Sequence, residues 1–391
     1  METEIKYWLR KILKDNIEDH SVNILGNPEK DDGYLSDILF VNLTPNSNNE
    51  GKTYELVLKC NKTSQAFRET TPIKEAFKSE MFIYNKVIPE FTNVPVCYGT
   101  LATKDVQIIV LENLKISGYV LWDKKHPFTR KHIDLVVEEY AKFHSLSIAL
   151  QINDPQKFKE LSDCLGDTLN EFVKANNLGV LFGRAVLEIH DLLKGDLDED
   201  TLSTWKILYE KAHFILEDMV DKNEALTVIL HASCWCNNFM FKYASGENLL
   251  PIRVSMLDWQ MSRTSSPILD LSYFIFSHIS SEDIQHMSDI LNVYYEKLKL
   301  HSSQLGADLH DFYPKQQFLD DWRKYVKFGA LYSSLVYKLC ATEKDEVIDV
   351  ADTSDSGKNF TEAFAYEVKN KAAFKNRAKH VVKYMVENQL I

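Results

Sequence analysis

Several kinds of segment are missing from the sequence, and each absence argues against a class of protein. No uninterrupted apolar run approaches the roughly 18 residues that cross a membrane, so a membrane-spanning protein is not expected. The N-terminal run METEIKYWLR has acids where a secretory signal peptide has basic residues, and no apolar stretch follows it. No run of Lys and Arg with interleaved aromatics is present, and the net charge of −12 argues against a nucleic-acid-binding protein.

Cysteine is also sparse, because the 391 residues contain only six. They are too few and too scattered for a disulfide framework, so a reduced, cytoplasmic protein is the simplest expectation. Cys234 and Cys236 lack a second pair of ligands, which favours buried thiols over a zinc site. With 45% hydrophobic residues, the chain can bury one large or two moderate cores, and two lobes or domains are therefore expected.

The most informative stretch runs from Leu226 to Trp259. Three short apolar runs bracket two polar clusters there, a pattern typical of strand, loop, strand, turn and strand. The first polar cluster contains Asn238, and Asp258 lies at the end of the last run. An Asn and an Asp held close together supply the hard oxygen ligands that Mg²⁺ prefers. We therefore expect Asn238 and Asp258 to hold magnesium against the phosphates of ATP.

The position two residues after His231 decides how such chemistry would proceed. In phosphoryl transfer, a carboxylate at this position would orient the acceptor hydroxyl and take its proton. The sequence has Ser233 instead, and a serine hydroxyl cannot act as a carboxylate base near neutral pH. His231 and Ser233 are the candidate catalytic residues, and the sequence leaves turnover open.

Candidate phosphate-binding residues lie in the β-patterned N-terminal part. Gly33 with Ser36 could place backbone N–H groups over a phosphate, although a plain hairpin turn explains the same residues at least as well. Lys59 ends an apolar strand, where a lysine usually emerges into solvent. A helix predicted downstream places Glu80 on the side where it could reach Lys59, and this ion pair would hold the ammonium on the phosphates. A solvated helix charge is the alternative for Glu80.

The chain changes character after residue 114. The strand that ends at Leu111 leads into Glu112-Asn113-Leu114, which in a two-lobed nucleotide enzyme would be the connector whose backbone meets the adenine. From Gly118 onward the composition turns helical. We therefore expect an α+β fold, with a small β-rich N-lobe over residues 1–114 and a larger helical C-lobe over residues 115–391.

Helical spacing of apolar residues predicts most of the remaining elements. His144 lies on an apolar helix face and is expected to be a hydrogen-bonded core residue. Asp270 lies in a strongly apolar helix that starts at Ser266-Pro267, and the loop backbone near His231 is its expected partner. Residues 343–359 are acidic and Ser/Thr-rich, which predicts a mobile surface loop. Further helices are expected over residues 3–18, 73–84, 132–150, 156–177, 180–194, 199–222, 281–301, 316–341, 360–372 and 374–388.

Taken together, these residues resemble the ecdysteroid-kinase-like family, a branch of the choline- and aminoglycoside-kinase group with the bilobal protein-kinase-like fold. The resemblance covers nearly the whole chain, and its motifs are specific jointly rather than singly. They are Phe77-x-x-Glu80-x-x-x-Tyr84, Glu112-x-Leu114, Ala141-Lys-Phe-His144, His231-x-x-x-Trp235-x-Asn237-Asn238, and Leu257-Asp258-Trp259-Gln260 followed by Ser266-Pro-x-Leu-Asp-Leu271.

The resemblance implies a role for each motif and also reveals two departures. It implies that Lys59, paired with Glu80, contacts the ATP phosphates and that Asn238 and Asp258 bind Mg²⁺. It also implies that the adenine lies near Leu111 to Leu114. Members of the family are thought to phosphorylate hydroxyls of steroids and other small molecules. The family's usual His-Gly-Asp is here His231-Ala232-Ser233, and its usual Glu-Asp-Leu is Glu112-Asn113-Leu114. The first departure removes the expected base, and the second matters less.

Two functions stay open on the sequence alone. The first is an ATP-dependent small-molecule kinase that works without the base, because phosphoryl transfer depends largely on positioning and electrostatics. The second is a pseudokinase that binds nucleotide or a steroid-like ligand without turnover; a structural adaptor without any ligand ranks below both. ATP and Mg²⁺ are the expected cofactors, and a small hydroxylated acceptor, with steroids among the candidates, is the expected partner.

Overall fold

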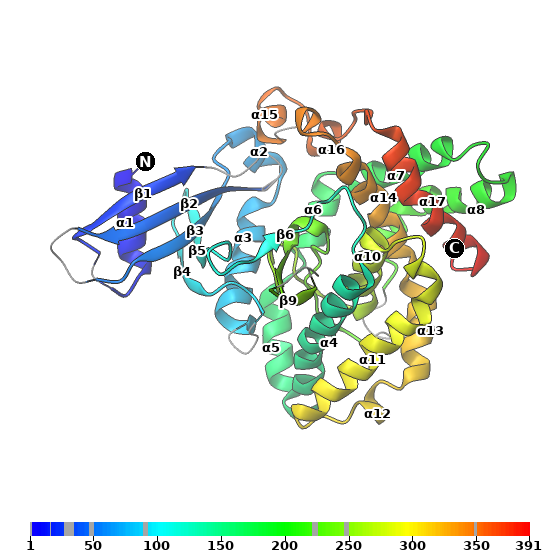
Figure 1. Cartoon of the computed structure of the whole chain (residues 1–391), viewed down its shortest axis with the longest axis horizontal. Helices are drawn as coiled ribbons and strands as arrows, with labels where there is room; N and C mark the ends of the chain where they lie inside the picture. The colour runs from blue at the N-terminus through cyan, green and yellow to red at the C-terminus, as the bar shows by residue number, and fades with distance from the viewer. Residues whose placement is uncertain are drawn as a thin grey trace.

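The computed structural model describes residues 2–15, 17–26, 35–46, 51–88, 93–220, 226–245, 250–347 and 350–391. An antiparallel sheet near the N-terminus lies beside a larger, mostly helical part (Figure 1). This arrangement confirms the predicted α+β class, with a small β-rich lobe and a larger helical lobe. The exact division at residue 114 stays a prediction. None of the helices in the described ranges is long and apolar enough to span a bilayer.

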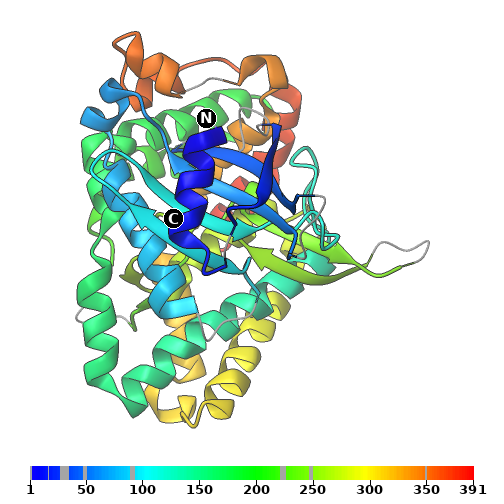
Figure 2. The ribbon, with the colours of Figure 1, turned by 90° about the vertical axis from the view of Figure 1, so that its left-hand side faces the viewer.

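The N-terminal sheet has five antiparallel strands in the order β1-β2-β3-β5-β4. Helix α1 (Glu2–Ile12) lies across one face of the sheet, as Figure 2 shows. Its Ile5 and Leu9 are buried in the core there. It ends earlier than the predicted residue 18, because the chain turns back and the Lys6 ammonium donates to the carbonyls of Glu18 and His20. The other elements are β1 (His20–Gly26), β2 (Ser36–Pro45), β3 (Tyr54–Asn61), α2 (Gln65–Thr70), α3 (Ile73–Phe82), the π-helical turn η1 (Ile83–Val87), β4 (Cys97–Ala102) and β5 (Gln107–Glu112).

The helical part is organised around α10 (Pro267–His278), in which every residue is buried. Its apolar side chains pack against α14 (Lys327–Ala341) and α4 (Arg130–Asn153), and α4 also packs along α11 (Met287–Gln304). The surrounding helices and short helical turns are α5 (Pro155–Leu165), α6 (Thr168–Ala175), α7 (Leu178–Leu192), α8 (Glu199–Glu210), α9 (Ala212–Glu217), η3 (Cys236–Asn238), η4 (Asp283–His286), α12 (Leu309–Phe312), α13 (Lys315–Tyr325), η5 (Lys344–Glu346), α15 (Val350–Asp355), α16 (Phe360–Ala363) and α17 (Lys371–Glu387).

Two small sheets position the polar loops where the two parts meet. Strands β6 (Val120–Leu121), β8 (Phe239–Tyr243) and β9 (Pro251–Met256) form one of them, and β7 (Val228–Ile229) pairs with β10 (Thr264–Ser265) in the other. The predicted alternation of strands and loops between Leu226 and Trp259 is confirmed by β7, β8 and β9.

Several predicted helices are divided or shortened, and one predicted loop is helical. Residues 156–177 form α5 and α6, because Gly166 has a left-handed φ of 70° and the Asp167 side chain caps α6. The ranges 199–222 and 316–341 are likewise split in two, and 360–372 contains only the short α16 before α17 begins. The predicted loop 343–359 is wrong in its centre, where α15 forms and Ser64 donates a hydrogen bond to Asp355.

Candidate active site

A buried lysine lies between two carboxylates at the junction of the two parts. The Lys59 ammonium lies 2.7 Å from a carboxylate oxygen of Glu80 and 2.7 Å from one of Asp258. The predicted Lys59–Glu80 ion pair is therefore present. Lys59 does not emerge into solvent, since β3 lies between β2 and β5 and leaves the residue 5% exposed. Glu80 is fully buried and also accepts a hydrogen bond from the Trp259 backbone N–H at 3.3 Å.

The electrostatics of this cluster keep a positive charge inside the junction. Burial disfavours the ammonium of Lys59, but the carboxylates of Asp258 and Glu80 outweigh burial and raise the pKa of Lys59. Burial raises the pKa of Glu80 to about 7; Lys59 opposes this shift and Asp258 adds to it. Lys59 is thus a charged group that a phosphate could attract, with one carboxylate partner that titrates near neutral pH.

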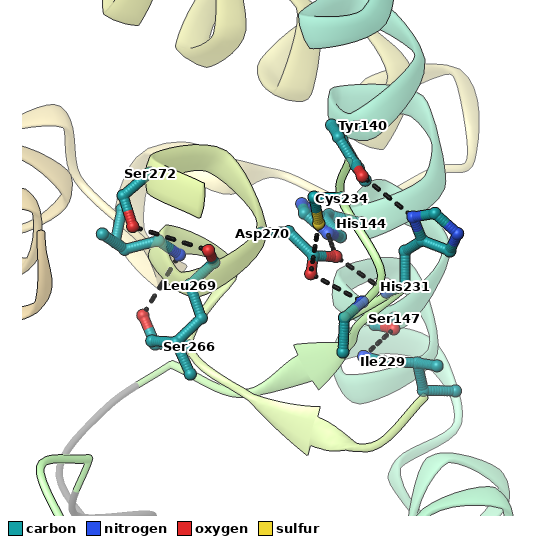
Figure 3. A network of polar contacts seen from close by, with 12 residues as sticks. Tyr140, His144, Ser147, Ile229, His231, Cys234, Ser266, Leu269, Asp270 and Ser272 are labelled. Carbon is teal, nitrogen blue, oxygen red and sulfur yellow. Dashed lines mark hydrogen bonds and ion pairs between the residues drawn. The ribbon is translucent and has the colours of Figure 1, made fainter. Parts of the chain in front are cut away.

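Asp270 holds the loop that carries the candidate catalytic residues. Its carboxylate accepts the backbone N–H groups of His231 at 2.7 Å and Ala232 at 2.8 Å (Figure 3). It also lies 3.3 Å from the His144 ring and accepts from the Cys234 thiol at 3.3 Å. The expectations for Asp270 and for His144 as a buried, hydrogen-bonded core residue are both confirmed.

His231 contacts the protein interior with both ring nitrogens. Its Nδ1 pairs with the Tyr140 hydroxyl at 2.9 Å, and its Nε2 lies 2.7 Å from the carbonyl oxygen of Leu257. Burial lowers the pKa of His231 despite the nearby Asp270 carboxylate, so the ring is neutral and Nε2 donates to the carbonyl. This geometry favours a positioning role next to Asp258, and the predicted catalytic role of His231 stays a prediction.

Asn238 links Ser233 to the chain just before Asp258. Its amide nitrogen donates to the Ser233 carbonyl oxygen at 2.9 Å and to the Ser233 hydroxyl at 2.8 Å. The amide oxygen makes no hydrogen bond to any residue in the described ranges, so it is available as a ligand. The Leu257 N–H donates to the Asn238 carbonyl at 2.9 Å and brings the chain just before Asp258 alongside.

A cavity at the junction brings the predicted cofactor residues together. It has about 840 Å³ of space, part of it open to solvent. Gly33 lies outside the described residues, and every other predicted cofactor or metal residue lines this cavity. They are Ser36, Lys59, Glu80, Leu111, Glu112, Asn113, Leu114, Asn238 and Asp258. We call this space the junction cavity.

The apolar walls of the junction cavity were missed by the sequence analysis. Ile38 and Phe40 from β2, Val57 from β3 and Met240 from β8 line it together with Leu257. The alternation of Ile38 and Phe40 along β2 was the available signal, because residues two apart on a strand share one face. Such walls suit the flat, apolar faces of a purine base.

The donor set at the cavity's edge fits magnesium better than zinc. No cluster of three or more His, Cys, Asp or Glu side chains suited to a metal occurs in the described part of the chain. Magnesium in phosphoryl-transfer sites needs only one or two protein oxygens, because waters and phosphates complete its shell. The free amide oxygen of Asn238 and the partly exposed carboxylate of Asp258 meet that requirement.

Comparison with known families agrees with this geometry. The model of the ecdysteroid kinase-like family matches residues 30–307, which is more than half of the chain. The chain belongs to the ecdysteroid kinase-like family. No curated protein has a significantly similar sequence.

Three solved structures illustrate what this chain is similar to. A GDP complex of a mutant aminoglycoside 2'-phosphotransferase has 10% identity and a TM-score of 0.46, covering 100% of this chain and 98% of its own. A glucosamine kinase with glucosamine, ADP and inorganic phosphate has 10% identity and a TM-score of 0.33, covering 98% and 99%. A fructosamine-3-kinase, described as putative, from Haemophilus somnus has 12% identity and a TM-score of 0.32, covering 88% and 92%. At such values the likeness carries no information on activity.

In this ecdysteroid kinase-like chain, the loop at Ala232 carries backbone strain. Its φ is 60°, in the left-handed region that glycine adopts without cost. The family's usual glycine between the histidine and the acid therefore suits this backbone better than alanine. Two hydrogen bonds to Asp270, from the N–H groups of His231 and Ala232, hold the strained conformation in place.

Ser233 also borders a second cavity, on the side of the loop that faces α6, α7, α14 and α16. The second cavity has about 720 Å³ of space, again partly open to solvent, and its walls are mainly apolar. Ser233 and the Asn238 amide, 2.8 Å apart, thus lie between the second cavity and the junction cavity. We call the second space the apolar cavity.

Proposed function

We propose that this chain is an ATP-dependent kinase that transfers the γ-phosphate of ATP to a hydroxyl of a small molecule, with steroids among the candidate acceptors. The observation that carries the proposal is Lys59 held 2.7 Å from both Glu80 and Asp258 in a cavity that Asn238 also lines. Phosphoryl transfer needs this set of parts: a cation for the phosphates, a carboxylate that orients it, and oxygen ligands for magnesium.

Each residue has a distinct part in the proposed reaction. The Lys59 ammonium exchanges its contact with Asp258 for phosphate oxygens and keeps its contact with Glu80. This exchange leaves the Asp258 carboxylate free to join the Asn238 amide oxygen as a metal ligand. Bound magnesium would supply neutralisation of the charge on the phosphates. The backbone from Leu111 to Leu114 and the apolar walls would hold the base.

Ser233 takes the place of the expected general base. Its hydroxyl is fixed by the Asn238 amide at 2.8 Å, so it can orient an acceptor hydroxyl by a hydrogen bond. The acceptor proton then leaves to solvent, because serine does not ionise near neutral pH. Loss of a general base typically lowers a rate by about 10²–10⁴, which predicts a slow kinase rather than an inactive one.

A pseudokinase that binds nucleotide without turnover is the second candidate, and Ser233 is the observation that favours it. Turnover separates the two. With γ-labelled ATP, Mg²⁺ and a hydroxylated steroid as acceptor, the kinase proposal expects slow transfer of label to the steroid or to water. Asp258→Ala should abolish this transfer, while Asp289→Ala on the exposed first turn of α11 should leave it unchanged. Bound ATP without any transfer would favour the pseudokinase.

A further inference from the structure

The composition of the apolar cavity restricts what can bind beside Ser233. Among the described residues that line it, none carries a charge. Among the same described residues, those with polar side-chain groups are Ser233, Trp235, Tyr273 and Tyr332.

Two tyrosines give this cavity unused hydrogen-bonding capacity. Tyr273 and Tyr332 are only 6% and 7% exposed. In the described part of the chain neither hydroxyl is hydrogen-bonded to the protein, and neither is among the fully buried polar atoms that lack a partner, so both keep some accessible surface. Burial raises the pKa of both groups, so both stay neutral and can donate a proton to an acceptor oxygen. Both tyrosines line the cavity, so a bound ligand with a carbonyl or ether oxygen could accept a hydrogen bond from either hydroxyl.

Aromatic rings give the cavity flat walls. The ring centroids of Tyr273 and Tyr332 are 4.6 Å apart, and those of Phe182 and Tyr332 are 4.4 Å apart. Phe360 closes another side, with its ring 5.0 Å from that of Phe172. Such walls favour a rigid, ring-shaped body over a flexible chain, because less conformational freedom is lost on binding.

The wall formed by Phe360 is held firmly in place. It begins α16, whose N-terminus has reciprocal hydrogen bonds between Asn359 and Glu362. The Thr361 hydroxyl donates to the backbone carbonyl of Asn176, which joins α16 to the chain between α6 and α7. The side of the apolar cavity that Phe360 forms is therefore tied to the rest of the helical part.

These walls discriminate strongly between hydroxylated molecules. A hydroxyl buried here without a partner costs roughly tenfold in affinity, because it loses its hydrogen bonds to water. An ammonium would lose more, since no carboxylate lines the space. Each additional methylene buried gains about fourfold. The cavity thus selects against sugars, aminoglycosides and steroids with many hydroxyls.

We propose that the acceptor of this chain is an uncharged, rigid, largely apolar ring compound with a single hydroxyl, which meets Ser233, and a hydrogen-bond-accepting oxygen for Tyr273 or Tyr332. The transfer step rests on the function proposed above, whereas binding in the apolar cavity does not. In that step the acceptor oxygen forms a bond to the γ-phosphorus of ATP as the bond to the bridging oxygen breaks. ADP leaves with the electron pair, and the hydroxyl proton passes to solvent.

Binding of three probes tests the class of acceptor directly. Androsterone has one hydroxyl and one carbonyl on a fused-ring body, ecdysone has several hydroxyls on the same kind of skeleton, and kanamycin is a polycation. Titration calorimetry, with Trp235 fluorescence as a second signal, should give a dissociation constant for androsterone at least tenfold below that for ecdysone, and no binding of kanamycin. Equal or tighter binding of ecdysone or kanamycin would overturn the proposal.

A matched pair of variants locates the site. Leu339 is a half-buried residue of α14 on the wall of the apolar cavity, so a change there is tolerated better than in the fully buried core. Leu339→Glu should weaken androsterone binding more than tenfold, and Leu339→Met should leave it within about threefold. Androsterone binding that Leu339→Glu leaves intact would place the ligand elsewhere and contradict the proposal.

A thermal shift with Mg-ATP on the same proteins separates the two proposals. Both Leu339 variants should retain the shift of the wild type, which shows that they fold. Androsterone binding without any effect of ATP would support the apolar cavity and contradict the kinase function. A thermal shift with Mg-ATP together with tighter binding of ecdysone than of androsterone would support the kinase function and contradict the proposed acceptor class.

Discussion

Removing the Asp270 carboxylate should lower the stability of the protein strongly. It accepts the N–H groups of His231 and Ala232 at 2.7 and 2.8 Å in a fully buried setting. A hydrogen bond to a charged group contributes about 1.5–3 kcal/mol, and removing one partner leaves the others buried and unsatisfied. We expect Asp270→Ala to lower the free energy of unfolding by about 3–5 kcal/mol.

The pH dependence provides an internal check on this prediction. Burial opposes the charge of Asp270, but the hydrogen bond and charge of His144 and the His231 backbone outweigh it and hold the pKa of the carboxyl below its usual value. A depressed pKa gives stability that is present above the unfolded-state value, about 3.9 for Asp, and is lost as the pH falls through the folded-state value. The difference in the free energy of unfolding between the wild type and Asp270→Ala should therefore become smaller at acidic pH.

Urea unfolding measures both effects, and hydrogen exchange at the His231 and Ala232 amides shows whether the loop opens. Asp289→Ala is the matched control, since this acid also lies in the first turn of a helix but is exposed. Its effect should stay within about 0.5 kcal/mol. Equal losses of stability in the Asp270 and Asp289 variants would refute the assignment of Asp270 as the residue that holds the loop.

Three further predictions follow from the same site. Ala232→Gly should stabilise the protein by about 0.5–1 kcal/mol in urea unfolding, because the left-handed φ of 60° is unstrained for glycine. A loss of stability in this variant would contradict the claim that Ala232 is strained. The pKa of Glu80 is raised from 4.5 to about 7, so the folded state binds the extra proton, and the free energy of unfolding should fall as the pH rises between these values. Glu80→Gln should flatten this pH dependence of stability. An unchanged pH profile in Glu80→Gln would assign the pH dependence to another group. Ser233→Asp should raise the transfer rate by about 10²–10⁴ if the missing base limits turnover, and no increase in initial rate would show that it does not.

The sequence pattern predicted the contacts of residues that lie on regular strands and helices. The Lys59–Glu80 pair was predictable because strand and helix spacing fix where each side chain points. Asp270 was predictable in another way: an acid in an apolar helix needs a partner, and the nearby loop offers backbone N–H groups. The prediction for Asp270 thus rests on the requirement that a buried charge be satisfied.

Contacts set by tertiary packing were not predictable in the same way. Asp258 lies 199 residues from Lys59 in sequence, and only the packing of the two parts brings them together. The break at Gly166 interrupts a continuous helical pattern through a single left-handed φ. Helix α15 was missed because polar composition hid its anchoring contacts, which include buried Val350 and the Ser64–Asp355 hydrogen bond.

The central claim is that the junction cavity holds ATP with magnesium, and a thermal-shift titration tests it most directly. A ligand that binds only the folded state adds about 2.7 kcal/mol at 100 times its dissociation constant, so the midpoint must rise with concentration. The account predicts a rise with ATP that depends on Mg²⁺ and that Asp258→Ala loses. No rise at millimolar ATP, or an equal rise in Asp258→Ala, would contradict it.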